Sequence, residues 1–171
     1  MILMLIAVFF TVFFTAKSIF PLKYKDVITE NAGKYGMDPY LVMAVIRTES
    51  NFKESAVSSA DAIGLMQITE ETGQYIAGNL GYADFSKNTL YNAEKNIEFG
   101  TWYINWLMEM YPNNLENVLA AYNAGFNNVN KWLSDEKYSS DGKTLDKIPY
   151  RETENFVNRA ELYRSIYRIL Y

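Results

Sequence analysis

A chain without histidine or cysteine has few side chains that can do chemistry near neutral pH. The 171 residues include neither type, which excludes Ser-His-Asp and Cys-His catalysis, histidine or thiolate metal sites, and disulfides. Carboxylates, Lys, Tyr and hydroxyl groups remain. With such groups, a carboxylic acid of raised pKa is the commonest proton donor. The chemistry of this chain is therefore expected at an acidic residue in an apolar setting.

Glu49 fits that description. Val42, Val45, Ile46 and Glu49 follow the spacing i, i+3, i+4, i+7, which puts them on one face of a helix. Glu49 thus continues a core-facing stripe in the last helical turn, where burial and the helix dipole both raise its pKa. The alternative is a solvated helix-end glutamate paired with Lys53. Spacing alone favours this alternative, because most glutamates are exposed.

The elements that must position Glu49 are helices separated by Gly, Pro, Asn and Asp. No segment alternates like a strand over any length, although a short hairpin within residues 78–90 stays open. Residues 51–63 and 134–149 are expected to be loops. The sequence therefore predicts an all-α fold, with helices at Tyr24–Tyr35, Asp38–Ser50, Gly64 to about Gly78, Asn92–Tyr111, Leu115–Ala124, Asn127–Leu133 and Glu152–Leu170.

The N-terminus is a targeting segment. Residues 2–14 are apolar except for Thr11, and Ala16-Lys17-Ser18 resembles a signal-peptide cleavage site. A membrane anchor running on to Phe20 is the alternative, although it would carry Lys17. The basic residues follow the apolar stretch rather than precede it, which by the positive-inside rule does not favour export. On balance we expect export to the cell envelope, either to the outer side of the cytoplasmic membrane or as a secreted protein.

The length and net charge of the chain limit the remaining classes of protein to which it could belong. The length suits one domain, and no repeat or linker divides it, so we assign residues 1–20 to a signal peptide or anchor and residues 21–171 to a single domain. The net charge is -4 and no basic stripe is present, which argues against nucleic-acid binding. We expect a monomer.

Several motifs together resemble the soluble lytic transglycosylase family. Each is weak alone, but they occur in the family's order between Tyr24 and Arg164. The resemblance implies a lysozyme-like catalytic domain. The motifs that carry the resemblance are Tyr35-Gly36-Met37-Asp38-Pro39, Glu49-Ser50-Asn51-Phe52, Ala56-x-Ser58, Gly64-Leu65-Met66-Gln67-Ile68, Asn96-Ile97 with Gly100 and Tyr103, Ala121-Tyr122-Asn123-Ala124-Gly125, and Ile148-Pro149-Tyr150-Arg151-Glu152-Thr153.

The resemblance also implies the site. Glu49 would be the catalytic acid and base, with no metal and no cofactor. Gly64 is expected to let the chain pass close to Glu49 and start a helix, with Gln67 in its first turn offering an amide to a sugar. Without the resemblance, the remaining residues read as core or solvated positions. Substrate binding is assigned to Ser58, Met66, Gln67, Tyr122, Asn123 and Glu152.

The implied substrate is the glycan strand of peptidoglycan, cut at the β-1,4 bond between N-acetylmuramic acid and N-acetylglucosamine. By the family mechanism, Glu49 protonates the glycosidic oxygen and then deprotonates the C6 hydroxyl, which closes onto C1 to form a 1,6-anhydro end. A hydrolytic muramidase would add water and use a second carboxylate, for which Asp61, Glu70 and Glu152 are candidates. A peptidoglycan-binding module without catalysis and a structural part of a wall-spanning assembly are further alternatives.

Three positions depart from the family pattern. Asp61 stands where the family often has Gly, so the loop before Gly64 is expected to turn differently. Thr69-Glu70 replaces the usual Met-Pro, which puts the lining of the groove there in doubt, and Phe126 stands where Pro is frequent. None of these positions coincides with Glu49.

Overall fold

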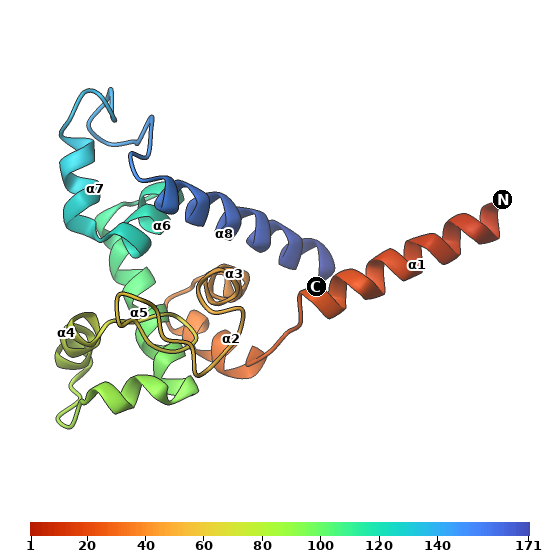
Figure 1. Ribbon diagram of the computed structural model, residues 1–171, viewed down its shortest axis with the longest axis horizontal. Helices are drawn as coiled ribbons and strands as arrows, with labels where there is room; N and C mark the ends of the chain where they lie inside the picture. Colours follow the sequence, from red (N-terminus) through yellow and green to blue (C-terminus); the bar gives the residue numbers. More distant parts are fainter.

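The computed structural model describes all 171 residues, and its regular elements are all helices, which confirms the all-α prediction. It has no strands, only isolated bridges that pair Ile63 with Val57 and with Ile68. The hairpin left open for residues 78–90 is absent, and a short 3-10 helix closes that region. In chain order the elements are α1 Ile2–Ile19, α2 Lys25–Lys34, α3 Pro39–Glu49, α4 Glu70–Leu80, η1 Lys87–Tyr91, α5 Ala93–Met110, α6 Leu115–Ala124, α7 Phe126–Leu133 and α8 Arg151–Leu170 (Figure 1).

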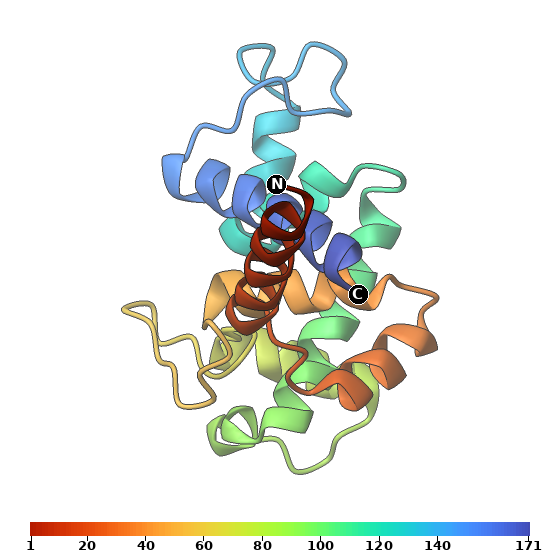
Figure 2. The same cartoon turned by 90° about the vertical axis from the view of Figure 1, so that its right-hand side faces the viewer.

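Helix α3 lies at the centre of the core because nearly all of it is apolar. Its residues from Leu41 to Ile46 are all buried. Asp38 caps its N-terminus by accepting a hydrogen bond from the backbone N–H of Tyr40 (3.0 Å), and Pro39 occupies the first helical position. Helix α8 packs across α3, and both views show the two helices next to each other (Figures 1 and 2). The C-terminal end of α3 is thereby held near the first turn of α8.

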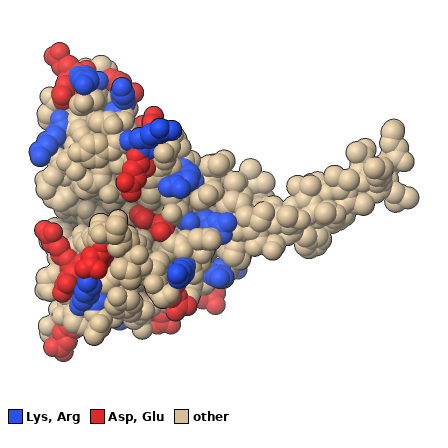
Figure 3. Space-filling view, viewed as in Figure 1, with Lys and Arg blue, Asp and Glu red and all other residues tan.

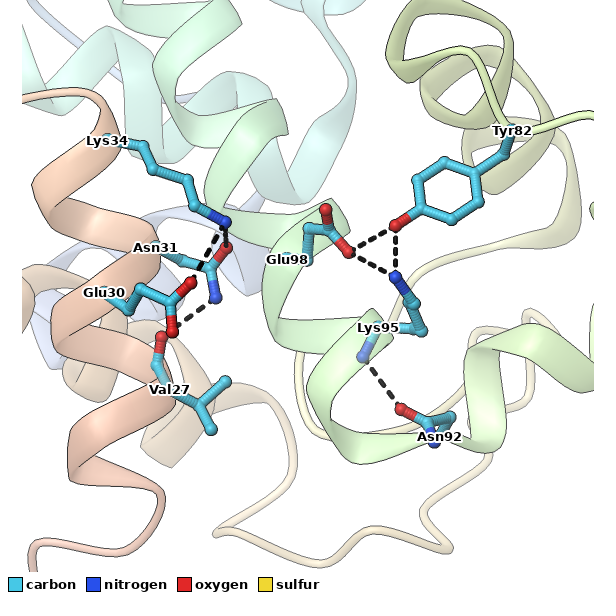
Figure 4. A network of polar contacts seen from close by, with 8 residues as sticks. All are labelled: Val27, Glu30, Asn31, Lys34, Tyr82, Asn92, Lys95 and Glu98. Atoms are coloured by element: carbon cyan, nitrogen blue, oxygen red, sulfur yellow. Dashed lines mark hydrogen bonds and ion pairs between the residues drawn. The ribbon is translucent and has the colours of Figure 1, made fainter.

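Helix α5 crosses the lower part of the body and is tied to its neighbours by polar contacts. The Tyr82 hydroxyl donates to the Glu98 carboxylate (2.7 Å), and Lys95 pairs with the same carboxylate (3.0 Å) and with the Tyr82 hydroxyl (Figure 4). Lys34 of α2 lies on the facing side of this network, where it hydrogen-bonds Asn31 (3.2 Å). The contacts of Tyr82 therefore tie the start of α5, which carries Asn96, to the segment that follows α4.

The segment after Gly64 is a turn, so the prediction of a helix from Gly64 to about Gly78 is wrong at its start. Gly64 (φ +81°) and Gln67 (φ +49°) are in the left-handed region, which is incompatible with a right-handed helix. Helix α4 instead begins after Thr69, whose hydroxyl accepts from the Thr72 N–H (3.2 Å). It ends at Leu80, close to the predicted end near Gly78, and Gly81 (φ +78°) provides a left-handed C-cap.

Helix α1 projects from the body as an isolated apolar rod (Figures 1 and 3). None of its residues is buried, and its 18 residues have a mean hydropathy of 2.2, enough by length and composition to cross a membrane. The chain joins the body at Phe20, which is only 9% exposed and packs edge-on against the rings of Tyr163 and Tyr167. The Tyr171 hydroxyl donates to the Phe20 carbonyl (2.9 Å) at the same junction.

Candidate active site

Glu49 lies in a cleft at the C-terminal end of α3. The cleft has a volume of about 330 Å³. Helix α3, the turns of residues 58–69, the end of α6 and the first turn of α8 each contribute to its walls. Five of the six residues predicted to bind substrate line it together with Glu49: Ser58, Gln67, Tyr122, Asn123 and Glu152.

The Glu49 carboxyl has no protein partner. It forms no hydrogen bond or ion pair, so the alternative of a pair with Lys53 is not observed. Burial is the largest cause that raises the pKa of Glu49, the nearby charge of Glu152 adds to it, and the charge of Arg159 opposes it, which together bring the pKa to about 8. A carboxyl with this pKa is largely protonated at neutral pH, so it can donate a proton into the cleft.

The turn at residues 63–68 is held under the cleft by the buried amide of Asn96. The Asn96 Oδ1 accepts from the backbone N–H of Met66 (2.7 Å), and its Nδ2 donates to the carbonyls of Ile63 and Leu90 (both 2.9 Å). A Cβ at Gly64 would lie 2.4 Å from the Asn96 Nδ2. Gly64 is therefore required by its closeness to Asn96 and Leu90, and not, as the sequence suggested, by closeness to Glu49.

Gln67 reaches the cleft from this turn and not from a helix. Its Nε2 donates to the carbonyls of Gly64 (2.8 Å) and Ala56 (3.2 Å). Because both neighbours are acceptors, the amide nitrogen must face them and the side-chain oxygen is left for a ligand. Gln67 is thus placed to accept a hydrogen bond, whereas its N–H groups are already used.

Met66 is the one residue of the predicted substrate-binding set that does not line the cleft. It is fully buried and packs against Gly100, where a Cβ would lie 2.3 Å from the Met66 sulfur. What Met66 offers is its backbone carbonyl, which accepts from the Tyr122 hydroxyl (2.8 Å). Burial raises the pKa of Tyr122 well above its ordinary value, and the Glu49 charge raises it further, so Tyr122 stays protonated and links α6 to the turn.

Ser58 and Asp61 shape the loop of residues 58–62, which forms another wall of the cleft. The Ser58 Oγ accepts from the backbone N–H groups of Ala60 (3.2 Å) and Ala62 (3.1 Å), which leaves its own proton for a ligand. Asp61 adopts φ +64°, the left-handed conformation that glycine favours. The loop therefore keeps the backbone turn that a glycine would make, and the Asp61 side chain pairs with Lys87 (2.5 Å).

Asn123 and Glu152 complete the predicted set. The side chain of Asn123 makes no hydrogen bond within the protein, and it lines the cleft with its polar atoms free. Glu152 is exposed in the first turn of α8 and forms no ion pair. The cleft thus holds two carboxyl groups, one sheltered and one solvated.

Sequence reasoning missed the aromatic side of the cleft. An adjoining cavity of about 500 Å³ shares Thr72, Tyr103, Ala124 and Gly125 with it. Its walls carry parallel rings of Tyr103 and Trp106, whose centroids are 5.7 Å apart. Tyr103 was recognised only as part of a helix motif, and the i, i+3 spacing of these two aromatic residues was the available signal. The other aromatic residues of this cavity are Tyr75 and Phe126.

Comparison with known proteins identifies the family. A family model described as the transglycosylase SLT domain matches residues 26–145. The chain is 36% identical over 124 residues to the membrane-bound lytic murein transglycosylase C of Edwardsiella ictaluri, covering 67% of this chain and 34% of that protein.

Solved structures agree with that assignment. The 70 kDa soluble lytic transglycosylase of Escherichia coli superposes with a TM-score of 0.79 at 27% identity, covering 90% of this chain and 25% of that one. An inactive glutamate-to-glutamine mutant of the lytic transglycosylase Slt from Pseudomonas aeruginosa superposes with a TM-score of 0.76 at 27% identity, covering 86% and 24%. The chain therefore spans a quarter to a third of these relatives, and their lysozyme-like fold is its own. The chain belongs to the transglycosylase SLT domain family.

Proposed function

We propose that this chain is a peptidoglycan lytic transglycosylase in which Glu49 is the single acid and base. The observation that carries the proposal is the Glu49 carboxyl, unpaired at the end of α3 in a cleft lined by polar side chains, with a pKa raised to about 8. Family membership and the inactive glutamate-to-glutamine mutant of the Pseudomonas aeruginosa relative support the same assignment.

In the proposed reaction, Glu49 donates its proton to the glycosidic oxygen between N-acetylmuramic acid and N-acetylglucosamine, and the C1–O bond breaks. The acetamido oxygen of the muramic residue stabilises the positive charge at C1. The Glu49 carboxylate then accepts the proton of the C6 hydroxyl as that oxygen bonds to C1. Glu49 ends protonated, no water is consumed, and the product has a 1,6-anhydro end.

The neighbouring groups are assigned supporting roles. Glu152 keeps the proton on Glu49 by electrostatic repulsion. The free proton of Ser58, the free amide of Asn123 and the side-chain oxygen of Gln67 would orient the sugars. Tyr122 would hold the turn beneath them through the Met66 carbonyl. One sheltered carboxyl is sufficient, because an internal hydroxyl replaces the activated water of a two-carboxylate hydrolase.

Digestion of purified peptidoglycan tests the proposal. The wild type should release fragments with anhydromuramic ends, seen in mass spectra 18 Da lighter than reducing-end fragments, and Glu49→Gln should lower the rate by about 10²- to 10⁴-fold. Glu94→Gln, at an exposed first-turn glutamate of α5 that lines neither the cleft nor the adjoining cavity, is the matched control and should keep the wild-type rate. Fragments with reducing ends would instead identify a hydrolytic muramidase. Unimpaired cleavage by Glu49→Gln would remove Glu49 as the acid.

We further propose that residues 1–20 direct the domain of residues 21–171 to the cell envelope, as a cleaved signal peptide or as a retained anchor. The exposed apolar helix α1 supports this assignment, as does the membrane-bound description of a relative. The domain would then meet the glycan strands outside the cytoplasmic membrane. The mass of the protein isolated from cells distinguishes the two forms of the N-terminus.

A further inference from the structure

The cleft continues past Glu152 onto an exposed face of α8. The spacing of residues 152, 155, 159 and 162 places them on one side of the helix. They border a shallow depression of about 460 Å³, and Glu152 lines both this depression and the cleft, so the two are continuous. We call this surface the α8 ledge, and its five residues, all exposed, are Glu152, Asn155, Asn158, Arg159 and Leu162.

Arg159 is the cationic residue of the ledge, and it has no ion-pair partner. Its Nε donates to the Asn155 carbonyl within the helix (3.3 Å). Arg164 and Arg168 of the same helix are both bound to Asp38 (2.8 Å each). A guanidinium has five N–H donors, so Arg159 keeps four for a ligand. Its charge also acts on Glu49, which places it close to the reacting end of the cleft.

The two ends of the cleft differ in chemistry. The cavity beyond Tyr103 is lined by aromatic rings, which suit the apolar faces of sugars. The ledge has no aromatic residue and offers two amides and a guanidinium. The muramic residues of peptidoglycan carry a lactyl group that is extended by a stem peptide with free carboxylates, and planar bidentate recognition of carboxylates is the usual use of arginine.

We propose that the α8 ledge binds the stem peptide of the strand being cut, with Arg159 paired to a stem carboxylate and Asn155 and Asn158 bonded to its amides. Glu152 repels a carboxylate at the near end, whereas Arg159 attracts one about 10 Å further along the helix. That separation suits an extended peptide and not the short lactyl group. The inference rests on the proposed glycan cleavage and makes Arg159 a determinant of substrate preference.

The test compares two glycans at pH 6, where Glu49 stays protonated. One carries intact stems, and the other is the same material after an amidase has removed them. Wild type should cleave the stem-bearing glycan with the higher kcat/KM. Arg159→Gln should lose about fivefold on that glycan through KM and nothing on the stripped one. Arg159→Lys should recover part of the loss, and Arg151→Gln, at the start of the same helix but outside the ledge, should match wild type.

The outcomes separate the two proposals. An equal loss on both glycans would assign Arg159 to the lactyl carboxylate or to the Glu49 environment, and no loss on either would leave the ledge without a ligand. Each result would overturn the stem-peptide proposal. If the wild type cleaves neither glycan, the proposed function fails, and calorimetric titration of the two glycans into the protein still decides the ledge. Equal affinities for stem-bearing and stripped glycan would then refute it.

Discussion

At the scale of residues, the two carboxyl groups of the cleft differ in their surroundings. Glu49 is sheltered and keeps its proton near neutral pH, whereas Glu152 is exposed one helix away and supplies negative charge. A group with a raised pKa of about 8 loses its acid form as the pH rises through that value. Glycan cleavage is therefore expected to fall on the alkaline side, above about pH 8.

Glu152→Gln should move this alkaline limit to lower pH. The substitution removes a negative charge that disfavours ionisation of Glu49, so the Glu49 pKa falls toward its ordinary value and the acid form is lost earlier. The measurement is kcat/KM on purified glycan between pH 5 and pH 10. Glu154→Gln, exposed in the same helical turn but outside the cleft, is the control. An unmoved limit in Glu152→Gln would mean that this charge does not reach Glu49.

At the scale of elements, α3 is held at its far end by Asp38. One carboxylate caps α3 and also binds Arg164 and Arg168 of α8. Burial alone would raise the pKa of Asp38, but the hydrogen bonds from Arg164 and the Tyr40 N–H and the two arginine charges lower it overall. The contact therefore stabilises the fold above the ordinary pKa of aspartate, and its contribution is lost as the pH falls through the lowered value.

Asp38→Ala should lower the free energy of unfolding at pH 7 by about 2 kcal/mol, because both the helix cap and a partly buried ion pair are lost. The difference from wild type should begin to shrink below about pH 4, where Asp38 becomes protonated in the unfolded chain, and should keep shrinking as the pH falls through the lowered pKa of the folded chain. Urea denaturation at pH 7 and pH 3.5 measures both values. Asp26→Ala, an exposed first-turn aspartate of α2 without a bonded partner, should change stability by less than about 0.5 kcal/mol. A loss independent of pH would contradict the ionic part of this explanation.

Asn96 supports the turn of residues 63–68 beneath the cleft, as Asp38 supports the far end of α3. Asn96→Ala leaves the Met66 N–H and the Ile63 and Leu90 carbonyls without partners in the interior, so we expect a loss of about 3 kcal/mol. The turn that carries Gln67 should loosen and KM should rise. Thermal unfolding and steady-state kinetics measure the two effects. Asn105→Ala, which removes only an exposed contact to Glu109 on the same helix, should show neither.

The sequence predicted the elements better than the turns between them. Apolar periodicity and caps placed α2, α3, α5, α6 and α8 within a residue or two. The start of α4 was wrong because Gly64 and Gln67 take left-handed conformations that tertiary contacts impose. Met66 was assigned to the groove because motif position does not reveal side-chain direction. Arg159 was missed because its importance depends on how α8 packs against α3.

At the scale of the whole molecule, α1 and the body are joined but do not share a core. Charged side chains are scattered over the body, whereas the α1 rod shows none along most of its length, and Lys and Arg atoms lie near the place where the two meet (Figure 3). Lys17 lies over the Tyr171 ring at this junction, 4.5 Å from its centroid. Because α1 buries nothing, the stability of the fold should not depend on it.

Deletion of residues 1–19 should leave the melting temperature within a few degrees of wild type and preserve glycan cleavage, while abolishing partition into lipid vesicles. Phe20→Ala in the full-length chain should instead lower stability by about 3 kcal/mol, because it empties a site between Tyr163 and Tyr167. Calorimetry and vesicle flotation provide the readouts. Unfolding of the shortened chain would show that α1 belongs to the core after all.

The Phe20 junction also limits how far the cleft can move away from helix α1. Only residues 20–24 separate α1 from α2, and Phe20 is already fixed inside the body. A flexible tether of n residues lets its cargo wander by roughly 5–6 Å × √n, but here almost no free segment exists. Where α1 is retained in a bilayer, the domain is confined to a thin layer above the lipid surface. Such a protein would reach only the glycan strands that lie next to the membrane.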